Sequence, residues 1–293
     1  LYAFTGWFIG LQNTRITMTV SIVQNIVNIV ASLTLVYGMG MKIDGVATGT
    51  LIAQWGGLLV AASYACLKHR GLLRSLSFRA VTRGEALMRF FNVNRDIFLR
   101  TLFLVAVNLF FVSAGATQGT IVLAVNTLLM QLFTLFSYVM DGFAYAGEAL
   151  CGKYAGAGDR TGFHATVRRL FVWGAILTTA YTAVYALGGN TFLSLLTDDA
   201  PVLAAAAQYL PWAVAIPVAG VAAFVWDGVF IGTTSTRAML LSSAVAGVLF
   251  FAVFFAAAPA LHHHGLWLAF ICYLAARGIV QTFLFKTSSS AVS

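Results

Sequence analysis

The chain has 293 residues, of which 60% are hydrophobic and only 9% are charged, and its formal net charge is +8. A soluble domain carries roughly a quarter charged residues, so a globule of this size could not hide so much apolar surface from water. With 4 prolines and 27 glycines, the chain is also neither disordered nor collagen-like in composition. From its high apolar content we predict an all-α integral membrane protein.

Nine apolar segments are candidates for membrane-spanning helices. A bilayer core about 30 Å thick requires about 20 mostly apolar residues per helix. The chain opens at Leu1 inside an apolar stretch without a basic leader, which is not the pattern of a signal peptide, and we expect an N-terminally truncated chain. In chain order the predicted helices are 1–13 (cut short), 17–39, 45–67, 97–119, 123–152, 165–188, 203–232, 238–260 and 265–286.

The basic residues gather on one side of these segments. When the connections are numbered alternately, fifteen of the seventeen Lys and Arg residues fall on one side, whereas the other side receives Lys42 alone, together with Asp44, Asp198 and Asp199. Because basic residues are retained on the cytoplasmic side, this asymmetry predicts that residues 68–96 and the C-terminus are cytoplasmic. It also explains the positive net charge without a nucleic-acid partner.

A long hydrophilic connection divides the predicted helices into two groups. Basic residues alternate with Leu and Phe in residues 68–96, which favours an amphipathic helix on the inner membrane face, acting as a linker rather than as a regulatory segment. The predicted domains are therefore residues 1–67, the C-terminal half of a first transmembrane lobe; residues 68–96, the linker; and residues 97–293, a second lobe of six helices.

An internal repeat relates the two lobes. Residues 6–15 read GWFIGLQNTR and residues 228–237 read GVFIGTTSTR, with six identities at an offset of 222. Each copy is followed by one helix and by a glycine that opens the next helix, Gly45 or Gly265. An even number of predicted helices separates the copies, so the two lobes point the same way, as in transporters built from parallel repeats. The glycine spacing within each copy allows close helix contact.

Three carboxylates lie inside predicted helices, where charge costs at least about 2.5 kcal/mol and is usually functional. Asp141 and Glu148 are seven residues apart and share one helix face with Tyr138, and Asp227 lies on another helix. A desolvated carboxylate can bind H⁺, or Na⁺ with help from neighbouring oxygens, or attract a cationic solute. Since one occupant excludes the others, such a site can couple two fluxes.

Ion pairing is the alternative role for two of these carboxylates. Arg100 and Arg277 could neutralise Glu148 and Asp227, whereas no basic residue lies at the depth of Asp141. Function is therefore favoured for Asp141, and both roles stay open for the other two.

Other polar residues add less to the prediction. Asn108 and Gln131 lie within predicted helices and are candidates for lining the transport path. The run His262–His264 falls in a predicted solvated loop with nothing nearby to complete a metal site. No nucleophile, metal-binding or catalytic-triad spacing is present, so we expect neither an enzyme nor a cofactor other than the coupling ion.

Several long motifs resemble one transporter family. GWFIGLQNTRITM and NIVNIVASLTLVYGMGMKIDGVATGTLIAQ are similar to the fourth to sixth helices of the MATE (multidrug and toxic compound extrusion) family. NRDIFLRTL, YVMDGFAYAGEALCGKYAGAGD and WDGVFIGTTSTR resemble the second lobe of its DinF-like branch. The resemblance implies a two-lobe helical bundle in the plasma membrane, the inner membrane of a bacterium, that acts as a monomer. It also implies antiport, in which an organic and often cationic compound leaves while Na⁺ or H⁺ enters by alternating access.

The resemblance also bears on the candidate residues. It places Asp227 in the tenth helix of the family, and Asp141 and Glu148 in the eighth, where acidic residues of the second lobe are implicated in ion coupling. The acidic residue that other branches carry on the seventh helix has no counterpart in 97–119, which carries Asn108. A flippase for lipid-linked oligosaccharides is the alternative function, but it should show a cationic cavity, whereas the deep stripe here is acidic.

Overall fold

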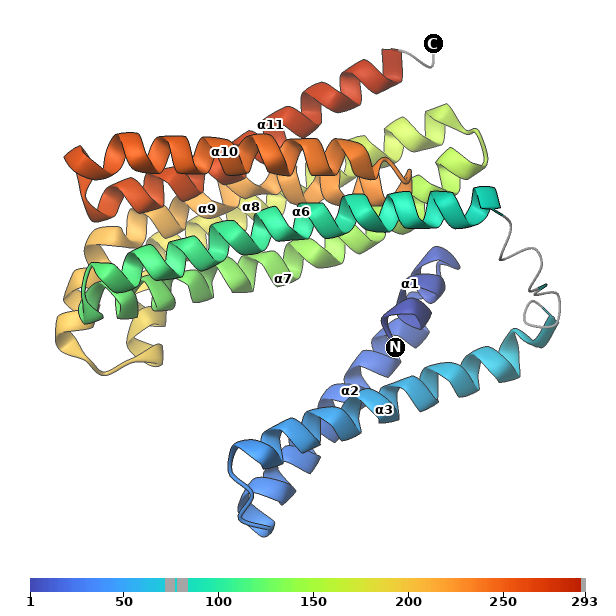
Figure 1. Cartoon of the computed structure of the whole chain (residues 1–293), viewed down its shortest axis with the longest axis horizontal. Helices are drawn as coiled ribbons and strands as arrows, with labels where there is room; N and C mark the ends of the chain where they lie inside the picture. Colours follow the sequence, from blue (N-terminus) through green and yellow to red (C-terminus); the bar gives the residue numbers. More distant parts are fainter. Residues whose placement is uncertain (72–76, 78–83, 291–293) are drawn as a thin grey trace. The chain divides into compact units, whose positions relative to one another are not determined.

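The computed structural model describes residues 1–71, 77 and 84–290, and these residues form helices and short connections without strands (Figure 1). Among them, eight helices are long and apolar enough to cross a membrane, and a ninth is short. The predicted all-α membrane architecture is therefore confirmed. The chain divides into two compact units, Leu1–Arg89 and Phe90–Ser293.

The first unit contains three helices joined by short connections. They are α1 (Tyr2–Gly10), α2 (Thr14–Leu33), which continues as the π-helical turn η1 (Thr34–Gly38), and α3 (Ile43–Lys68). Helices α2 and α3 touch closely, because a Cβ added at Gly49 would lie 2.4 Å from Ser32 Oγ. A small apolar core joins α1 to its neighbours and contains Phe8, Ile16, Val20, Ala61 and Ala65.

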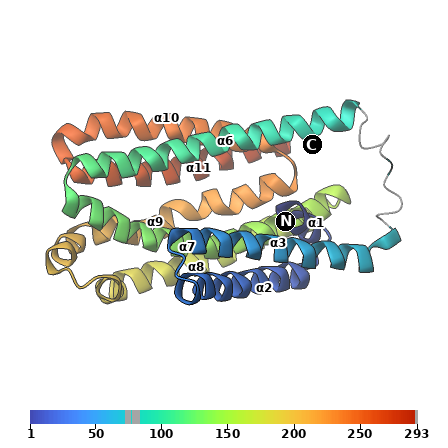
Figure 2. The ribbon, with the colours of Figure 1, turned by 60° about the horizontal axis from the view of Figure 1, so that its bottom comes forward.

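The second unit is a bundle of six helices, the first of which begins six residues before the boundary of the unit. They are α6 (Gly84–Thr117), α7 (Thr120–Gly156), α8 (Arg160–Leu196), α9 (Ala200–Gly232), α10 (Thr236–Leu261) and α11 (His263–Ser290). Helix α9 packs against α7, α8 and α11, and it carries the longest run of buried residues. Both views of the ribbon show α6 lying beside α10 (Figures 1 and 2).

Helix α6 begins earlier than the sequence predicts. The predicted linker ends at residue 96, but residues 84–96 form the first turns of α6. A hydropathy pattern detects only the apolar part of a helix, whereas a helix can continue past the bilayer on charged residues such as Arg89 and Arg95. Residues 72–76 and 78–83 lie outside the described residues, so the amphipathic linker helix remains a prediction.

Backbone contact between α7 and α9 organises the second unit. A Cβ added at Gly228 would lie 2.3 Å from the carbonyl oxygen of Ala144, and one added at Gly232 would lie 2.5 Å from that of Glu148. The close approach predicted from the glycine spacing is therefore present in this unit. The matching glycines of α1, Gly6 and Gly10, have no atom within 4 Å of an added Cβ among the described residues.

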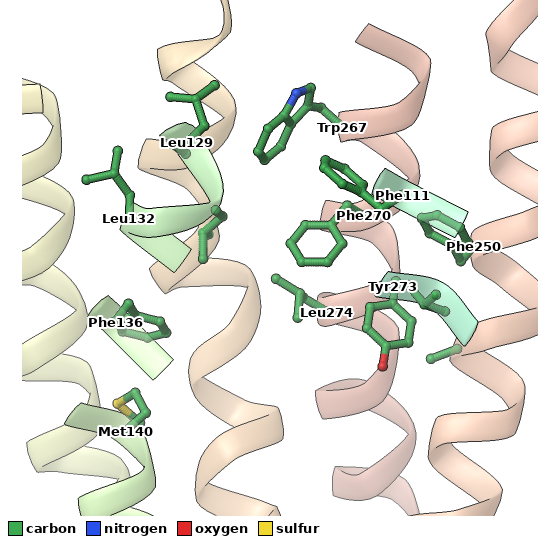
Figure 3. Close-up of a cluster of buried hydrophobic side chains, with 14 of the residues drawn as sticks. Phe111, Leu129, Leu132, Phe136, Met140, Phe250, Trp267, Phe270, Tyr273 and Leu274 are labelled. Atoms are coloured by element: carbon green, nitrogen blue, oxygen red, sulfur yellow. The ribbon is translucent and has the colours of Figure 1, made fainter. Parts of the chain in front are cut away.

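Aromatic side chains fill the bundle where α6, α7, α10 and α11 converge (Figure 3). The Trp267 ring meets the Phe111 ring edge-on with centroids 5.0 Å apart, and Phe250 and Phe270 are fully buried beside them. Trp267 Nε1 donates a hydrogen bond of 3.0 Å to Asn126 Oδ1 on α7, which satisfies the one polar atom of the indole.

The two copies of the sequence repeat adopt the same backbone. Gln12 and Thr234, which are 222 positions apart, both have φ of 57°, a left-handed value that is uncommon for residues other than glycine. The residue after each, Asn13 or Ser235, donates its backbone N–H across the helix end to Phe8 or Phe230, at 2.9 and 2.8 Å. These matched turns confirm that the repeat is structural and not a chance similarity.

Removing one buried hydrogen bond between α7 and α8 should have a small, measurable cost. Tyr185 is buried, and its hydroxyl donates to the carbonyl oxygen of Leu132 at 2.6 Å. In Tyr185→Phe we expect a loss of about 0.6 kcal/mol, the average for such bonds in membrane proteins, measured as a lower thermal unfolding temperature in detergent. Tyr181→Phe is the matched control, because Tyr181 makes no hydrogen bond within the described part of the chain and should melt as the wild type does.

Candidate ion-coupling site

A buried carboxylate at the centre of the second unit is held by three side chains. Asp227 on α9 accepts from Arg100 on α6 and from Arg277 on α11, and both arginines use the same oxygen, Oδ2. The Arg277 contact measures 2.7 Å, and Gln281 Nε2 donates to the other oxygen, Oδ1, also at 2.7 Å. One acidic group thus ties α6, α9 and α11 together.

Local packing sets the register of this cluster. Trp226 precedes Asp227, and its indole N–H donates to Thr282 Oγ1 at 2.8 Å, so adjacent residues of α9 bond to adjacent residues of α11. Arg277 and Gln281 are four residues apart and therefore share one face of α11. A Cβ at Gly278 would lie 2.7 Å from Ala222 Cβ, so α11 approaches α9 closely at this level.

The cluster carries more positive than negative charge. Two guanidinium groups meet one carboxylate, and Asp227, Arg277 and Gln281 are 6%, 5% and 0% exposed. The Nε atoms of Arg100 and Arg277 are buried and have no hydrogen-bond partner within the described residues. Buried charge is costly unless it is paired, so a second negative group nearby would favour the second arginine.

Asp141 is the second acidic group of this region. It lies on α7 with its side chain exposed, and its carboxylate interacts electrostatically with Asp227, Arg100 and Arg277. The expectation that Asp141 lies apart from basic residues is therefore wrong. The backbone contact between Ala144 and Gly228 holds α7 against α9 within one turn of both carboxylates. Within the residues described by the structure, Asp141 forms no direct ion pair.

The structure distinguishes the two predicted pairings. Arg100 and Arg277 both bind Asp227, so ion pairing, the alternative left open for this residue, is what the structure contains. Neither arginine pairs with Glu148, which is half-buried on α7 and makes no ion pair in the described segments. Asp227 and Glu148 therefore lie in different environments, although the sequence leaves the same two roles open for both.

The remaining predicted residues lie on exposed faces of α6 and α7. Gln131 and Tyr138 are exposed and are seven residues apart on α7, with Tyr138 71% exposed. Asn108 on α6 is also exposed. Its side-chain amide donates to the carbonyl oxygen of Leu104 at 3.0 Å, which is a bond within α6 itself. A role in transport stays a prediction for all three.

Two features of the bundle escape sequence reasoning. Gln281 binds Asp227 directly, and its only signal is a spacing of four from Arg277. The predicted solvated histidine loop is wrong for two of its residues, because α11 begins at His263. His263 contacts Gln118 of the α6–α7 connection, and His264 Nδ1 accepts from Trp212 Nε1 at 2.9 Å.

Comparison with known proteins decides the family. A family model described as MatE matches residues 97–256, which include α7, α8, α9 and most of α6 and α10. The chain belongs to the MATE family. MATE proteins are transporters and not enzymes, as the long motifs of the sequence predict, and the chain is a multi-pass membrane protein of this kind.

Named relatives agree with this assignment. The MATE chain is 37% identical over 276 residues to the DNA damage-inducible protein F of Escherichia coli (strain K12), covering 94% of this chain and 60% of that protein. It is 22% identical over 277 residues to Protein DETOXIFICATION 44, chloroplastic, of Arabidopsis thaliana, covering 94% of this chain and 52% of that protein. The chain thus spans between half and two thirds of the length of these relatives.

Solved structures share the fold. A crystal structure of a MATE protein in the straight conformation has a TM-score of 0.88 at 18% identity, covering 98% of this chain and 65% of that one. A MATE transporter of Vibrio cholerae has a TM-score of 0.88 at 15% identity, covering 99% of this chain and 66% of that one. At these identities the likeness concerns the fold alone.

Proposed function

We propose that the full-length protein is a secondary antiporter that exports organic compounds in exchange for a cation by alternating access. In this proposal it works as a monomer in the inner membrane of a bacterium, with a cytoplasmic C-terminus and no nucleic-acid partner. Family membership supports transport, and the skew of basic residues supports the orientation.

The observation that carries the antiport is the exposed Asp141 on an apolar helix. Its carboxylate forms no direct ion pair within the described residues, whereas that of Asp227 pairs with two arginines. An ionisable group kept at membrane depth is expensive and is retained for function. A proton, a metal cation and a cationic solute compete for such a carboxylate, and this competition couples the two fluxes. Glu148 is the secondary candidate on the same helix.

We propose the proton as the coupling ion. A proton needs only the one carboxylate, whereas a bound metal cation needs several ligands. The described residues contain no group of three or more His, Cys, Asp or Glu side chains that could hold a metal ion. The acidic stripe, formed by the exposed Asp141 and the half-buried Glu148, favours cationic or neutral organic solutes. The flippase alternative is disfavoured, because both deep arginines of the second unit are engaged with Asp227 and offer no open cationic platform for a pyrophosphate.

Efflux from proteoliposomes tests this function. The full-length protein is reconstituted, and efflux of a cationic dye is measured with a pH gradient alone and with a sodium gradient alone. We expect a response to the pH gradient that falls to background in Asp141→Asn, because the amide cannot exchange a proton. Asp198→Asn, which alters an exposed acid in the α8–α9 connection, is the control and should behave as the wild type does.

Three other outcomes of the efflux measurement would contradict parts of this proposal. Efflux that ignores both gradients contradicts antiport. Efflux driven by sodium alone contradicts the proton assignment and leaves antiport standing. Coupling that persists unchanged in Asp141→Asn moves the exchanging group elsewhere, with Glu148→Gln as the next variant.

A further inference from the structure

The charges of the buried Asp227 cluster balance only when Asp141 is counted with them. Asp227 has one negative charge for the two positive charges of Arg100 and Arg277. The acid that also interacts with both arginines is Asp141. Tyr138 and Tyr145 flank Asp141 on its own helix, with Glu148 seven residues on, but these tyrosines bring no full charge. The four charged groups therefore form two pairs when Asp141 is ionised.

Arg100 is the arginine that Asp227 can release. Without it, Asp227 still has one guanidinium on Oδ2, from Arg277, and one amide donor on Oδ1, from Gln281. The Arg100 side chain is 15% exposed, against 6% for Arg277. Arg277 is further fixed by the ring of Tyr273, 5.7 Å from its guanidinium carbon.

Chain geometry places Asp141 at a depth similar to that of Arg100. The connection between α6 and α7 is two residues long, Gln118 and Gly119, so the two helices run antiparallel from it. Arg100 lies 17 residues before Thr117, the last residue of α6, and Asp141 lies 21 residues after Thr120, the first residue of α7. At a rise of about 1.5 Å per residue, the two Cα atoms differ in depth by about 6 Å. A side chain as long as arginine spans most of this distance, and the charged carboxylate supplies the attraction.

We infer that Arg100 is a shared counter-ion that moves between Asp227 and Asp141 according to the occupancy of Asp141. This inference rests on the proposed function of Asp141. When Asp141 holds a proton or a cationic solute, Arg100 stays on Asp227 and ties α6 to α9. When Asp141 is ionised and empty, Arg100 pairs with it, ties α6 to α7, and leaves Asp227 to Arg277 and Gln281.

This exchange makes Arg100 a positioning residue for antiport. The empty, ionised Asp141 is neutralised by a tethered cation and is not left bare in an apolar helix. The occupancy of Asp141 then determines which helix α6 is tied to. Since α6 is one continuous helix from Gly84 to Thr117, the ion pair made by Arg100 positions the whole helix.

The pH profile of efflux distinguishes a shared counter-ion from a purely structural partner of Asp227. In Arg100→Gln we expect the midpoint of the profile to move to higher pH by about one unit, because a nearby positive charge no longer favours ionised Asp141. Arg100→Lys should restore the midpoint. Arg95→Gln is the matched control, five residues earlier on α6 and 64% exposed, and should leave the profile unchanged. An unshifted Arg100→Gln profile, or an equal shift in Arg95→Gln, would overturn the inference.

A spectroscopic test does not depend on the folding of an Arg100 variant. Infrared difference spectra of the full-length protein are recorded between acid and alkaline pH, with and without isotope labelling of the arginine guanidinium groups. We expect a carboxyl band and an isotope-sensitive arginine band to change together, and both to vanish in Asp141→Asn. A carboxyl band without an arginine band refutes only the moving counter-ion. The absence of any carboxyl band sensitive to Asp141→Asn refutes the proposed role of Asp141 itself.

Discussion

An alanine at position 228 is expected to destabilise the second unit by about 1–3 kcal/mol, although alanine is the better helix former. Its Cβ would lie 2.3 Å from the carbonyl oxygen of Ala144 and 2.7 Å from Ala144 Cα. Both atoms are backbone, so no side chain can move aside, and α7 and α9 must separate. The measurement is the thermal unfolding temperature of the full-length protein in detergent, with Gly228→Leu expected to prevent assembly.

The matched control for this variant is Gly188→Ala on α8. An added Cβ at Gly188 meets no atom within 4 Å, so only the gain in helix propensity remains, up to about 1 kcal/mol. The two substitutions are chemically identical and should change stability in opposite directions. Equal unfolding temperatures for the two variants would show that the α7–α9 contact is looser than the structure describes.

This glycine contact was predictable because its signal is local. Six identities in ten residues identify the repeat, and glycines four apart on one helix indicate a close crossing. The matching left-handed residues, Gln12 and Thr234, show that the local sequence also determines how each helix ends. The partner helix could not be deduced, since nothing in residues 228–232 specifies that α7 covers Gly228 while no described residue covers Gly6.

The charge cluster was less predictable because pairing depends on rotation about the helix axis as well as on depth. Sequence position places Arg100, Glu148 and Asp227 near the same level, which leaves two pairings open. The choice between them follows from which face of α6 and α11 turns towards α9, and this is decided by distant contacts. The bond from Trp226 to Thr282 and the close approach at Gly278 are examples.

Helix ends were predicted least well, for a related reason. The apolar pattern of α6 starts near residue 97, but the helix itself starts at Gly84, since charged residues can continue a helix beyond the hydrocarbon region. In the same way, three consecutive histidines resemble a solvated loop. His264 is helical because Trp212 and Tyr209 of α9 provide a hydrogen bond at 2.9 Å and a stacked ring at 4.7 Å.

Replacing Asp227 by asparagine is expected to cost about 3–5 kcal/mol of stability, the loss typical of a buried ion pair with one partner removed. The asparagine keeps the shape but leaves two guanidinium groups, on Arg100 and Arg277, without their shared carboxylate. Asp141→Asn is the matched control, because Asp141 is exposed and forms no direct ion pair in the described residues, and it should unfold close to the wild-type temperature. The two variants thus separate an acid that holds the fold from the acid proposed to exchange ions.

A double variant that adds Arg100→Gln to Asp227→Asn tests whether the loss of stability comes from unbalanced charge or from lost hydrogen bonds. If the destabilisation comes from surplus positive charge, removing one guanidinium should recover part of the lost stability, so that the double variant unfolds at a higher temperature than Asp227→Asn alone. If instead the three helices were held by hydrogen bonds without regard to charge, the second substitution would remove a further contact and lower the unfolding temperature again. A double variant less stable than Asp227→Asn would therefore contradict the electrostatic account. It would also contradict the view that Asp227 is paired with more positive charge than its single negative charge can neutralise.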